Sequence, residues 1–265
     1  MRPAGILCDL EGTLYSGDAP LPGATLLVPA LRARRIPFCF LTNTTSRSRR
    51  ALVARLASMG ISVAADEIVS APVAGAALLR ARGHEVVAPF MEEGVLEDLE
   101  GLVLQGGTAA PGDRRPTAIL LGDLGERWNF ALLQLAFDHV RDGAEIVTCS
   151  RDRAYRRHGE LVLDVGPFVA ALEYASGATA TLAGKPSPAM YDTAIRQLRL
   201  PAVERSSVLM IGDDMHSDIA GAQQAGLTAW AVATGKFSAA EAARAGIAPD
   251  RIIPGLDTLL AELGA

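Results

Sequence analysis

Cysteine and histidine are scarce in this chain of 265 residues, which has three cysteines and four histidines. Cys8, Cys39 and Cys149 are odd in number and far apart, so they provide neither a disulfide framework nor the spacing of a zinc site. Cys8 and Cys39 lie inside apolar runs, where cysteine usually acts as a small hydrophobic residue. We therefore expect a protein of a reducing compartment.

Long apolar runs and an excess of positive charge are also absent. No apolar run reaches the roughly 18 residues that a membrane-spanning helix requires. Met1-Arg2-Pro3 leads directly into the first predicted strand, without the apolar segment of a secretory leader. The net charge of −5 argues against a broad surface for nucleic acid or anionic lipid. These absences predict a cytoplasmic protein with neither a membrane nor a nucleic acid as its partner.

Two common nucleotide-binding signatures are missing as well. Gly184-Lys185 is not part of a Walker loop, because position 179 is not glycine and Pro186 stands where serine or threonine is required. No Gly-x-Gly-x-x-Gly motif follows a predicted strand, so a dinucleotide site is not predicted.

Predicted strands and helices alternate along the chain, which is typical of the α/β class. We predict a Rossmann-like, mainly parallel sheet with helices on both faces. Between residues 72 and 181 the sequence predicts a further series of helices and strands, and residues 105–116 form a loop rich in glycine, proline and charge. This stretch has the size of a small domain. We therefore predict a core built from residues 1–71 and 182–265 and an inserted α/β cap domain built from residues 72–181.

Four predicted strands end in polar residues. The first apolar run is followed by Asp9 and Glu11, and because residues i and i+2 of an extended chain point the same way, we expect both carboxylates to face one reaction centre. On its own, this pair is equally well explained as solvated acids at a strand end. The three other strand ends favour a site, since ligands bind at the carboxyl ends of parallel strands. They carry Thr42 and Asn43, then Lys185, then Asp213 and Asp214.

Carboxylates at strand ends suit a hard cation that prefers oxygen ligands, so we expect Mg²⁺ rather than zinc. A carboxylate such as Asp9, with a reference pKa of ~3.9, is ionised at neutral pH and can attack phosphorus. A metal ion and a lysine then offset the repulsion between that anion and the phosphate oxygens.

Four short motifs resemble, in order and spacing, those of the haloacid dehalogenase superfamily of phosphatases: Asp9-Leu10-Glu11-Gly12-Thr13-Leu14, Leu41-Thr42-Asn43, Gly184-Lys185-Pro186 and Gly212-Asp213-Asp214. The insert between the second and third motifs resembles the α/β cap of subclass IIA. That subclass includes NagD-like phosphatases and the phospholysine phosphohistidine inorganic pyrophosphate phosphatase group. Residues 166–175, together with the Gly184 motif, are especially similar to the latter group.

The resemblance implies a role for each matching residue. Asp9 would attack phosphorus and become an aspartyl phosphate, and Lys185 would neutralise the charge of nucleophile and phosphoryl group. Phosphate oxygens would be held by Thr42, Asn43, Thr44 and Lys185. Mg²⁺ would be held by the side chains of Asp9 and Asp213 and by the backbone carbonyl of Glu11. Asp214 and Asp218 would orient bound water or Lys185.

Glu11 departs from the pattern, because many members carry aspartate at this position, where it protonates the leaving group and then activates water. The extra methylene moves the carboxylate by about an ångström, a misplacement that can cost ~10²-fold in rate.

The resemblance implies a Mg²⁺-dependent phosphatase for small phosphorylated metabolites, namely phosphate monoesters, pyrophosphate or N-phosphoryl compounds. The alternative is a phosphometabolite-binding or regulatory protein whose catalysis is weakened by Glu11. The oligomeric state stays open, although an exposed cap surface would support a homodimer.

Overall fold

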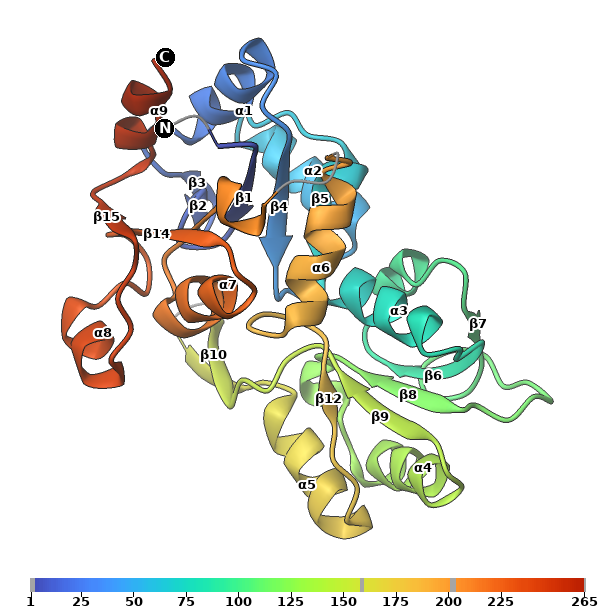
Figure 1. Cartoon of the computed structure of the whole chain (residues 1–265). Coiled ribbons are helices and arrows are strands. Elements are labelled where there is room, and N and C mark those ends of the chain that lie inside the picture. Colours follow the sequence, from blue (N-terminus) through green and yellow to red (C-terminus); the bar gives the residue numbers. More distant parts are fainter. Residues whose placement is uncertain (1–2, 158–159, 201–203, 265) are drawn as a thin grey trace. The chain divides into compact units, whose positions relative to one another are not determined.

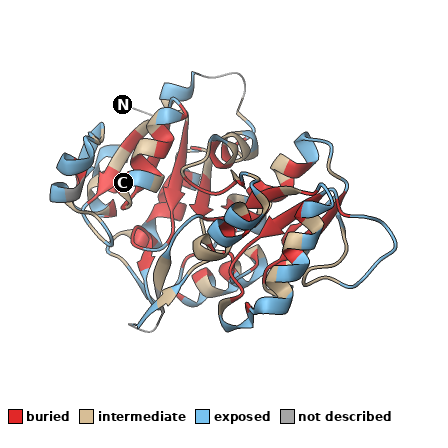
Figure 2. Ribbon diagram, turned by 90° about the horizontal axis from the view of Figure 1, so that it is seen from below, coloured by how far each residue is buried: buried red, intermediate tan, exposed pale blue. Residues whose placement is uncertain are grey.

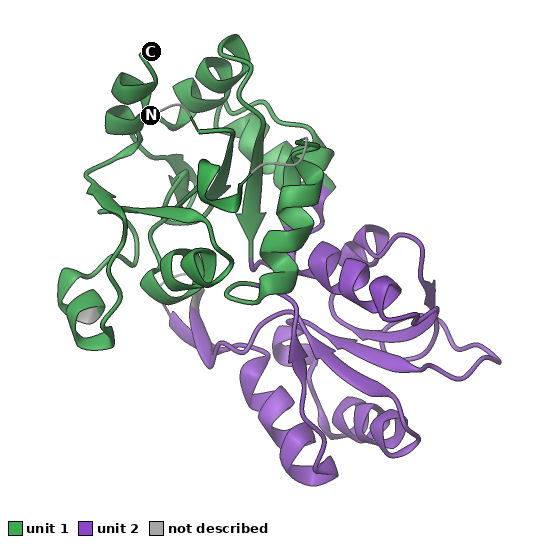
Figure 3. Ribbon diagram, viewed as in Figure 1, with its two compact units in different colours: residues 1–42, 50–69, 185–265 green, residues 43–49, 70–184 purple. Residues whose placement is uncertain are grey.

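The computed structural model describes residues 3–157, 160–200 and 204–264. The chain divides into two compact units (Figure 3). The first unit contains residues 1–42, 50–69 and 185–265, and the second contains residues 43–49 and 70–184. Most of the second unit is one continuous insert, residues 70–184. The short segment 43–49, which directly follows the strand Phe38–Thr42 of the first unit, also belongs to the second unit.

The first unit is built on a six-stranded sheet (Figure 1). Its strands lie in the order β15 (Arg251–Ile253), β14 (Thr228–Val232), β13 (Val208–Gly212), β1 (Gly5–Asp9), β4 (Phe38–Thr42) and β5 (Ile68–Ser70). The four pairings from β15 to β4 are parallel. Every residue of the central strands β1 and β13 is buried, which explains why both are unbroken apolar runs in the sequence.

Alternate residues of β1 face opposite sides of this sheet. Ile6 and Cys8 pack in a core with α1 (Ala24–Ala33), α2 (Arg49–Ser58) and α9 (Leu256–Leu263). Asp9 therefore points to the other face, where α6 (Pro188–Gln197) and α7 (Gly221–Gln224) pack against each other. The hairpin of β2 (Tyr15–Ser16) and β3 (Ala19–Pro20) follows β1, and α8 (Ala239–Ala245) follows β14.

The second unit has its own parallel sheet, with the order β12 (Thr181–Leu182), β9 (Glu145–Thr148), β8 (Ala118–Leu121), β6 (Val86–Phe90) and β7 (Val103–Leu104). One apolar core lies between the sheet and α4 (Phe130–Arg141) and α5 (Gly166–Ser176), and another lies between the sheet and α3 (Ala71–Ala81). An antiparallel hairpin, β10 (Ala154–Arg157) and β11 (Glu160–Leu163), follows β9.

The predicted α/β class, with parallel strands flanked by helices, is confirmed. Figure 2 shows buried residues along the strands of both sheets and exposed residues on the outer faces of the helices. The sequence predicts a helix from 217 to 225, whereas the structure begins this segment with a π-helical turn, Met215–Ala220, which continues into α7. Among the residues described, we find no helix with the length and apolar character needed to cross a bilayer.

Candidate active site

A buried ion pair joins Asp9, at the end of β1, to Lys185, which precedes α6. The Lys185 ammonium donates hydrogen bonds to Asp9 Oδ1 and, at 2.7 Å, to Asp218 Oδ1. All three residues are buried, and Asp218 is only 1% exposed. Ser187 caps the start of α6 by accepting a hydrogen bond from the Ala189 N–H. Lys185 therefore lies two residues before a capped helix N-terminus.

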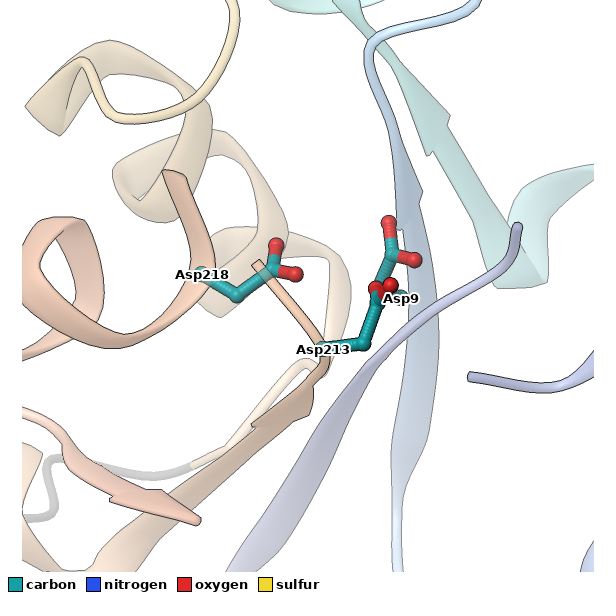
Figure 4. A group of neighbouring side chains, drawn as sticks. All are labelled: Asp9, Asp213 and Asp218. Atoms are coloured by element: carbon teal, nitrogen blue, oxygen red, sulfur yellow. The ribbon is translucent and has the colours of Figure 1, made fainter. Parts of the chain in front are cut away.

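Asp213 follows β13 directly and completes a group of three buried acids. Because β13 is the parallel neighbour of β1, with Cys8 opposite Ile211, the carboxyl ends of the two strands lie side by side. Asp9, Asp213 and Asp218 each present a carboxylate oxygen, and these oxygens lie within 4.8 Å of one another. Figure 4 shows Asp218 reaching from the π-helical turn toward the other two.

Burial shapes the electrostatics of this acidic group. Burial raises the pKa of Asp9 and of Asp213 to about 6 and that of Asp218 to about 7. The positive charge of Lys185 acts in the opposite direction on all three acids but does not cancel the effect of burial. Burial alone would lower the pKa of Lys185, but the Asp218 and Asp9 carboxylates hold it well above its ordinary value. Three ionised carboxylates around one ammonium leave an excess of negative charge in a dry environment.

The donor set fits a magnesium ion. Mg²⁺ prefers carboxylate and carbonyl oxygens, and an added divalent cation would offset the uncompensated negative charge of the three acids. The side chains of Asp9 and Asp213, with a backbone carbonyl of the turn after β1, are the groups on this chain that would hold it. Asp218 is already engaged by Lys185 and by the Asp214 N–H, whose nitrogen lies 3.1 Å from Asp218 Oδ2.

Glu11 lies differently from Asp9. Strand β1 ends at Asp9, so the alternation that would place both side chains on one side does not extend to Glu11. The Glu11 side chain is exposed, and its Oε1 accepts a hydrogen bond from the Gly17 N–H at 2.9 Å. The Glu11 carboxylate is thus bonded within the turn that follows β1, whereas the Asp9 carboxylate is buried and paired with Lys185.

Thr42 is the last residue of β4 and is buried beside the end of β1, since Leu41 pairs with Asp9. Asn43 and Thr44 come next, are partly buried, and belong to the second unit. The Asn43 side chain lies against the backbone of Gly184, where an added Cβ would be 2.7 Å from Asn43 Oδ1. A side chain at position 184 would therefore displace this amide.

Asp214 caps the π-helical turn instead of joining the acidic group. Its Oδ1 accepts hydrogen bonds from the His216 and Ser217 N–H groups, each at 3.0 Å. Burial alone would raise the pKa of Asp214, but these hydrogen bonds and the Lys236 charge hold it below its ordinary value. Asp214 stays ionised as a cap, and Asp218 fixes Lys185.

One element of the site has no counterpart among the predicted residues. After β14 the chain returns to the acidic group, and the Lys236 N–H donates to Asp213 Oδ2 at 2.6 Å. Thr234 Oγ1 donates to the Gly12 carbonyl at 2.6 Å. Its signal in the sequence is a further apolar strand followed by Thr234-Gly235-Lys236, a polar strand end like the other four.

Comparisons with known proteins define the class. Residues 6–110 match the family model of haloacid dehalogenase-like hydrolases, and residues 182–259 match the HAD-hydrolase-like model. The bovine (Bos taurus) haloacid dehalogenase-like hydrolase domain-containing protein 2 is 34% identical over 92% of this chain and 89% of its own length. The chain therefore belongs to the haloacid dehalogenase-like hydrolases.

Two further similarities narrow the class. The human (Homo sapiens) phospholysine phosphohistidine inorganic pyrophosphate phosphatase is 30% identical over 88% of this chain and 84% of its own length. A glycerol phosphate phosphatase from Mycobacterium tuberculosis, solved in complex with magnesium, is 30% identical with a TM-score of 0.83, covering 97% of this chain and 76% of that one. The chain is a phosphatase of subclass IIA, as its four motifs and the insert between the second and third motifs predict.

Proposed function

We propose that this protein is a Mg²⁺-dependent phosphatase that hydrolyses small phosphate monoesters through an aspartyl phosphate on Asp9. The observation that carries the proposal is the buried Asp9 carboxylate, paired with Lys185 and within 4.8 Å of the Asp213 and Asp218 oxygens. A related glycerol phosphate phosphatase was solved with magnesium, which supports both the substrate class and the metal.

In this mechanism an Asp9 oxygen forms a bond to phosphorus while the bond from phosphorus to the leaving oxygen breaks. Lys185 offsets the negative charge that accumulates between carboxylate and phosphoryl oxygens. Mg²⁺, held by Asp9, Asp213 and the backbone carbonyl of Glu11, supplies further positive charge when bound. Water then hydrolyses the aspartyl phosphate, which releases phosphate and restores Asp9.

The remaining roles follow from position. We assign Thr42, Asn43 and Thr44 to the phosphate oxygens, because they continue directly from a strand whose end lies beside Asp9. Glu11 protonates the leaving group and activates water, which requires its carboxylate to leave the Gly17 N–H. We assign the second unit as the cap that selects among monoesters, pyrophosphate and N-phosphoryl compounds.

The test is hydrolysis of p-nitrophenyl phosphate by purified protein, with Mg²⁺ and then with a chelator. Turnover that requires Mg²⁺ and is abolished in Asp9→Asn supports the proposal, because the amide is a poor nucleophile while keeping the shape of the side chain. Equal turnover without the metal, or activity retained in Asp9→Asn, contradicts it. A panel of phosphorylated metabolites, including pyrophosphate, then identifies the substrate.

The exposed position of Glu11 favours one alternative, a phosphometabolite-binding or regulatory protein with weakened catalysis. Tight binding of a phosphorylated metabolite with negligible turnover across the panel is the result that supports this alternative.

A further inference from the structure

The loop formed by Thr234, Gly235 and Lys236, called here the TGK loop, contacts the acidic group through its backbone. The Lys236 N–H donates to Asp213 Oδ2 at 2.6 Å, and Thr234 Oγ1 donates to the Gly12 carbonyl at 2.6 Å. Position 235 has a φ of +52°, a left-handed conformation that turns the chain between these two contacts. None of the three residues lies in the four motifs of the sequence.

Gly235 lets the loop approach this closely. A Cβ atom at position 235 would lie 2.6 Å from Gly12 Cα and closer still to Asp213 Oδ2, well inside van der Waals contact. Gly12 has a φ of +92°, and a Cβ there would lie 2.6 Å from Asp213 Cγ. The Asp213 carboxylate is therefore enclosed by two glycine backbones that have no room for side chains.

Both oxygens of Asp213 have a donor. Oδ2 accepts from the Lys236 N–H, and Oδ1 accepts from Thr13 Oγ1 at 3.3 Å. Asp213 is 2% exposed, so water offers little replacement if one of these donors is lost. Groups that hydrogen-bond a ligating carboxylate set its orientation and typically contribute about 10- to 100-fold to metal affinity.

We propose that the TGK loop is a positioning element that fixes the Asp213 carboxylate and the Gly12 turn for Mg²⁺. This inference rests on the proposed function, because it assumes that Asp213 binds the metal. Through the Gly12 carbonyl, the Thr234 hydroxyl also fixes the turn that carries the backbone carbonyl of Glu11. The loop thus orders two of the three groups assigned to the ion.

The test measures Mg²⁺ binding by isothermal titration calorimetry on chelator-treated protein, with Mg²⁺ as the only ligand. In Gly235→Ala, we expect the Kd for Mg²⁺ to rise about 10- to 100-fold. Gly246→Ala is the matched control, because Gly246 also has a left-handed φ, +66°, but an added Cβ there meets no atom within 4 Å. Both alanines carry the backbone cost, whereas only Gly235→Ala presses on Asp213, so the control Kd stays within about twofold.

A second pair of variants keeps the test sharp if Gly235→Ala folds poorly. Thr234→Val removes the hydroxyl at nearly constant volume, and we expect a Kd about fivefold higher, the equivalent of one lost hydrogen bond. Thr234→Ser keeps the hydroxyl and restores wild-type affinity. Circular dichroism in chelator shows that each variant is folded.

The outcomes separate the two ideas. If wild-type protein binds Mg²⁺ but Gly235→Ala and Thr234→Val bind it equally well, the TGK loop is only structural and the inference is wrong. If wild-type protein binds no Mg²⁺, the metal site of the proposed function fails, and the inference fails with it.

Discussion

The Nζ atom of Lys185 lies 2.7 Å from Asp218 Oδ1, and this carboxylate is almost fully buried. Since the same ammonium also pairs with Asp9, the lysine is held between a carboxylate that positions it and the carboxylate that we propose as nucleophile. The Lys185 ammonium thus lies among Asp9, Asp213 and Asp218. Burial disfavours the ionised form of each of these three acids.

Lys185→Met tests how far this cation stabilises the fold. Methionine keeps most of the side-chain volume but leaves Asp9 and Asp218 without the ammonium, and breaking a buried pair costs about 3–5 kcal/mol. We expect a loss of this size in the free energy of unfolding at pH 8, measured by urea denaturation in chelator. At pH 5 the loss is smaller, because the pKa values of the acids rise further without the cation and protonation removes their charge.

Lys236→Met is the control for Lys185→Met. The Lys236 side chain is 71% exposed and pairs with Asp214 at 3.2 Å, while its backbone N–H is unaffected by the substitution. An exposed pair of this kind contributes at most about 1 kcal/mol. A loss in Lys185→Met that is the same at pH 5 and pH 8 would contradict the electrostatic explanation.

Metal binding and pH are expected to be coupled. Burial raises the pKa of Asp9 and Asp213 to about 6 from an ordinary 3.8, so the metal-free native state holds protons that the unfolded chain has released. These two groups contribute stability that is complete below pH 3.8 and is lost as the pH rises through 6. Mg²⁺ requires the deprotonated carboxylates, so its stabilising effect grows over the same interval.

The corresponding measurement is the shift in Tm on adding Mg²⁺ at pH 5 and at pH 8. With Mg²⁺ at about 100 times its Kd, we expect an increase of about 5–10 °C at pH 8 and a smaller one at pH 5. NaCl at equal ionic strength and the variant Asp213→Asn should give no comparable shift. A shift that does not change with pH would show that neither acid titrates on binding.

Glu11 allows acid–base catalysis to be separated from metal binding. Glu11→Gln keeps an oxygen that accepts from the Gly17 N–H but cannot transfer a proton. We expect turnover of p-nitrophenyl phosphate to fall about 10²-fold, with Mg²⁺ affinity unchanged because this residue offers the metal only its backbone carbonyl. Glu11→Asp should keep or raise turnover, and a large loss there would mean that the site is adapted to the longer side chain.

The sequence was sufficient for the α/β class because the central strands are buried on both faces, so that β1 and β13 are visible as apolar runs ending in acids. The proximity of Asp9 and Asp213 follows from the parallel pairing of those two strands. The orientation of Glu11 was not predictable, because the alternation rule applies only while the strand continues, and β1 ends at Asp9.

Backbone contacts and exposed pairings carry little signal in a sequence. Asp213 accepts a hydrogen bond from the backbone N–H of Lys236, a group that every residue except proline has. The sequence therefore indicates this contact only through Gly235, where the structure has no room for a side chain. In the β10–β11 hairpin, Glu160, Leu161 and Leu163 are exposed, so these residues fit a solvated turn as well as a strand. Tyr155 of β10 also makes a tertiary hydrogen bond to Asp123.

We expect the hydrogen bond between Tyr155 and Asp123 to stabilise the hairpin. Tyr155, on β10, donates its hydroxyl to Asp123 Oδ2 at 3.0 Å, while Asp123 Oδ1 accepts from the Gly125 N–H at 2.8 Å. The Asp123 N–H in turn donates to Thr45 Oγ1 at 2.8 Å. Asp123 is 8% exposed, so removing the tyrosine hydroxyl leaves a buried carboxylate oxygen short of a donor.

Tyr155→Phe should therefore lower the free energy of unfolding by about 1.5–3 kcal/mol, the range for a hydrogen bond to a charged group. It should also speed amide hydrogen exchange in peptides containing β10 or β11, because the hairpin loses its anchor within the second unit. Tyr174→Phe is the matched control, since Tyr174 is 94% exposed and loses no buried hydrogen bond. If both variants exchange like wild type, packing of β10 against its partner strand is sufficient to hold the hairpin, and the Asp123 contact is dispensable.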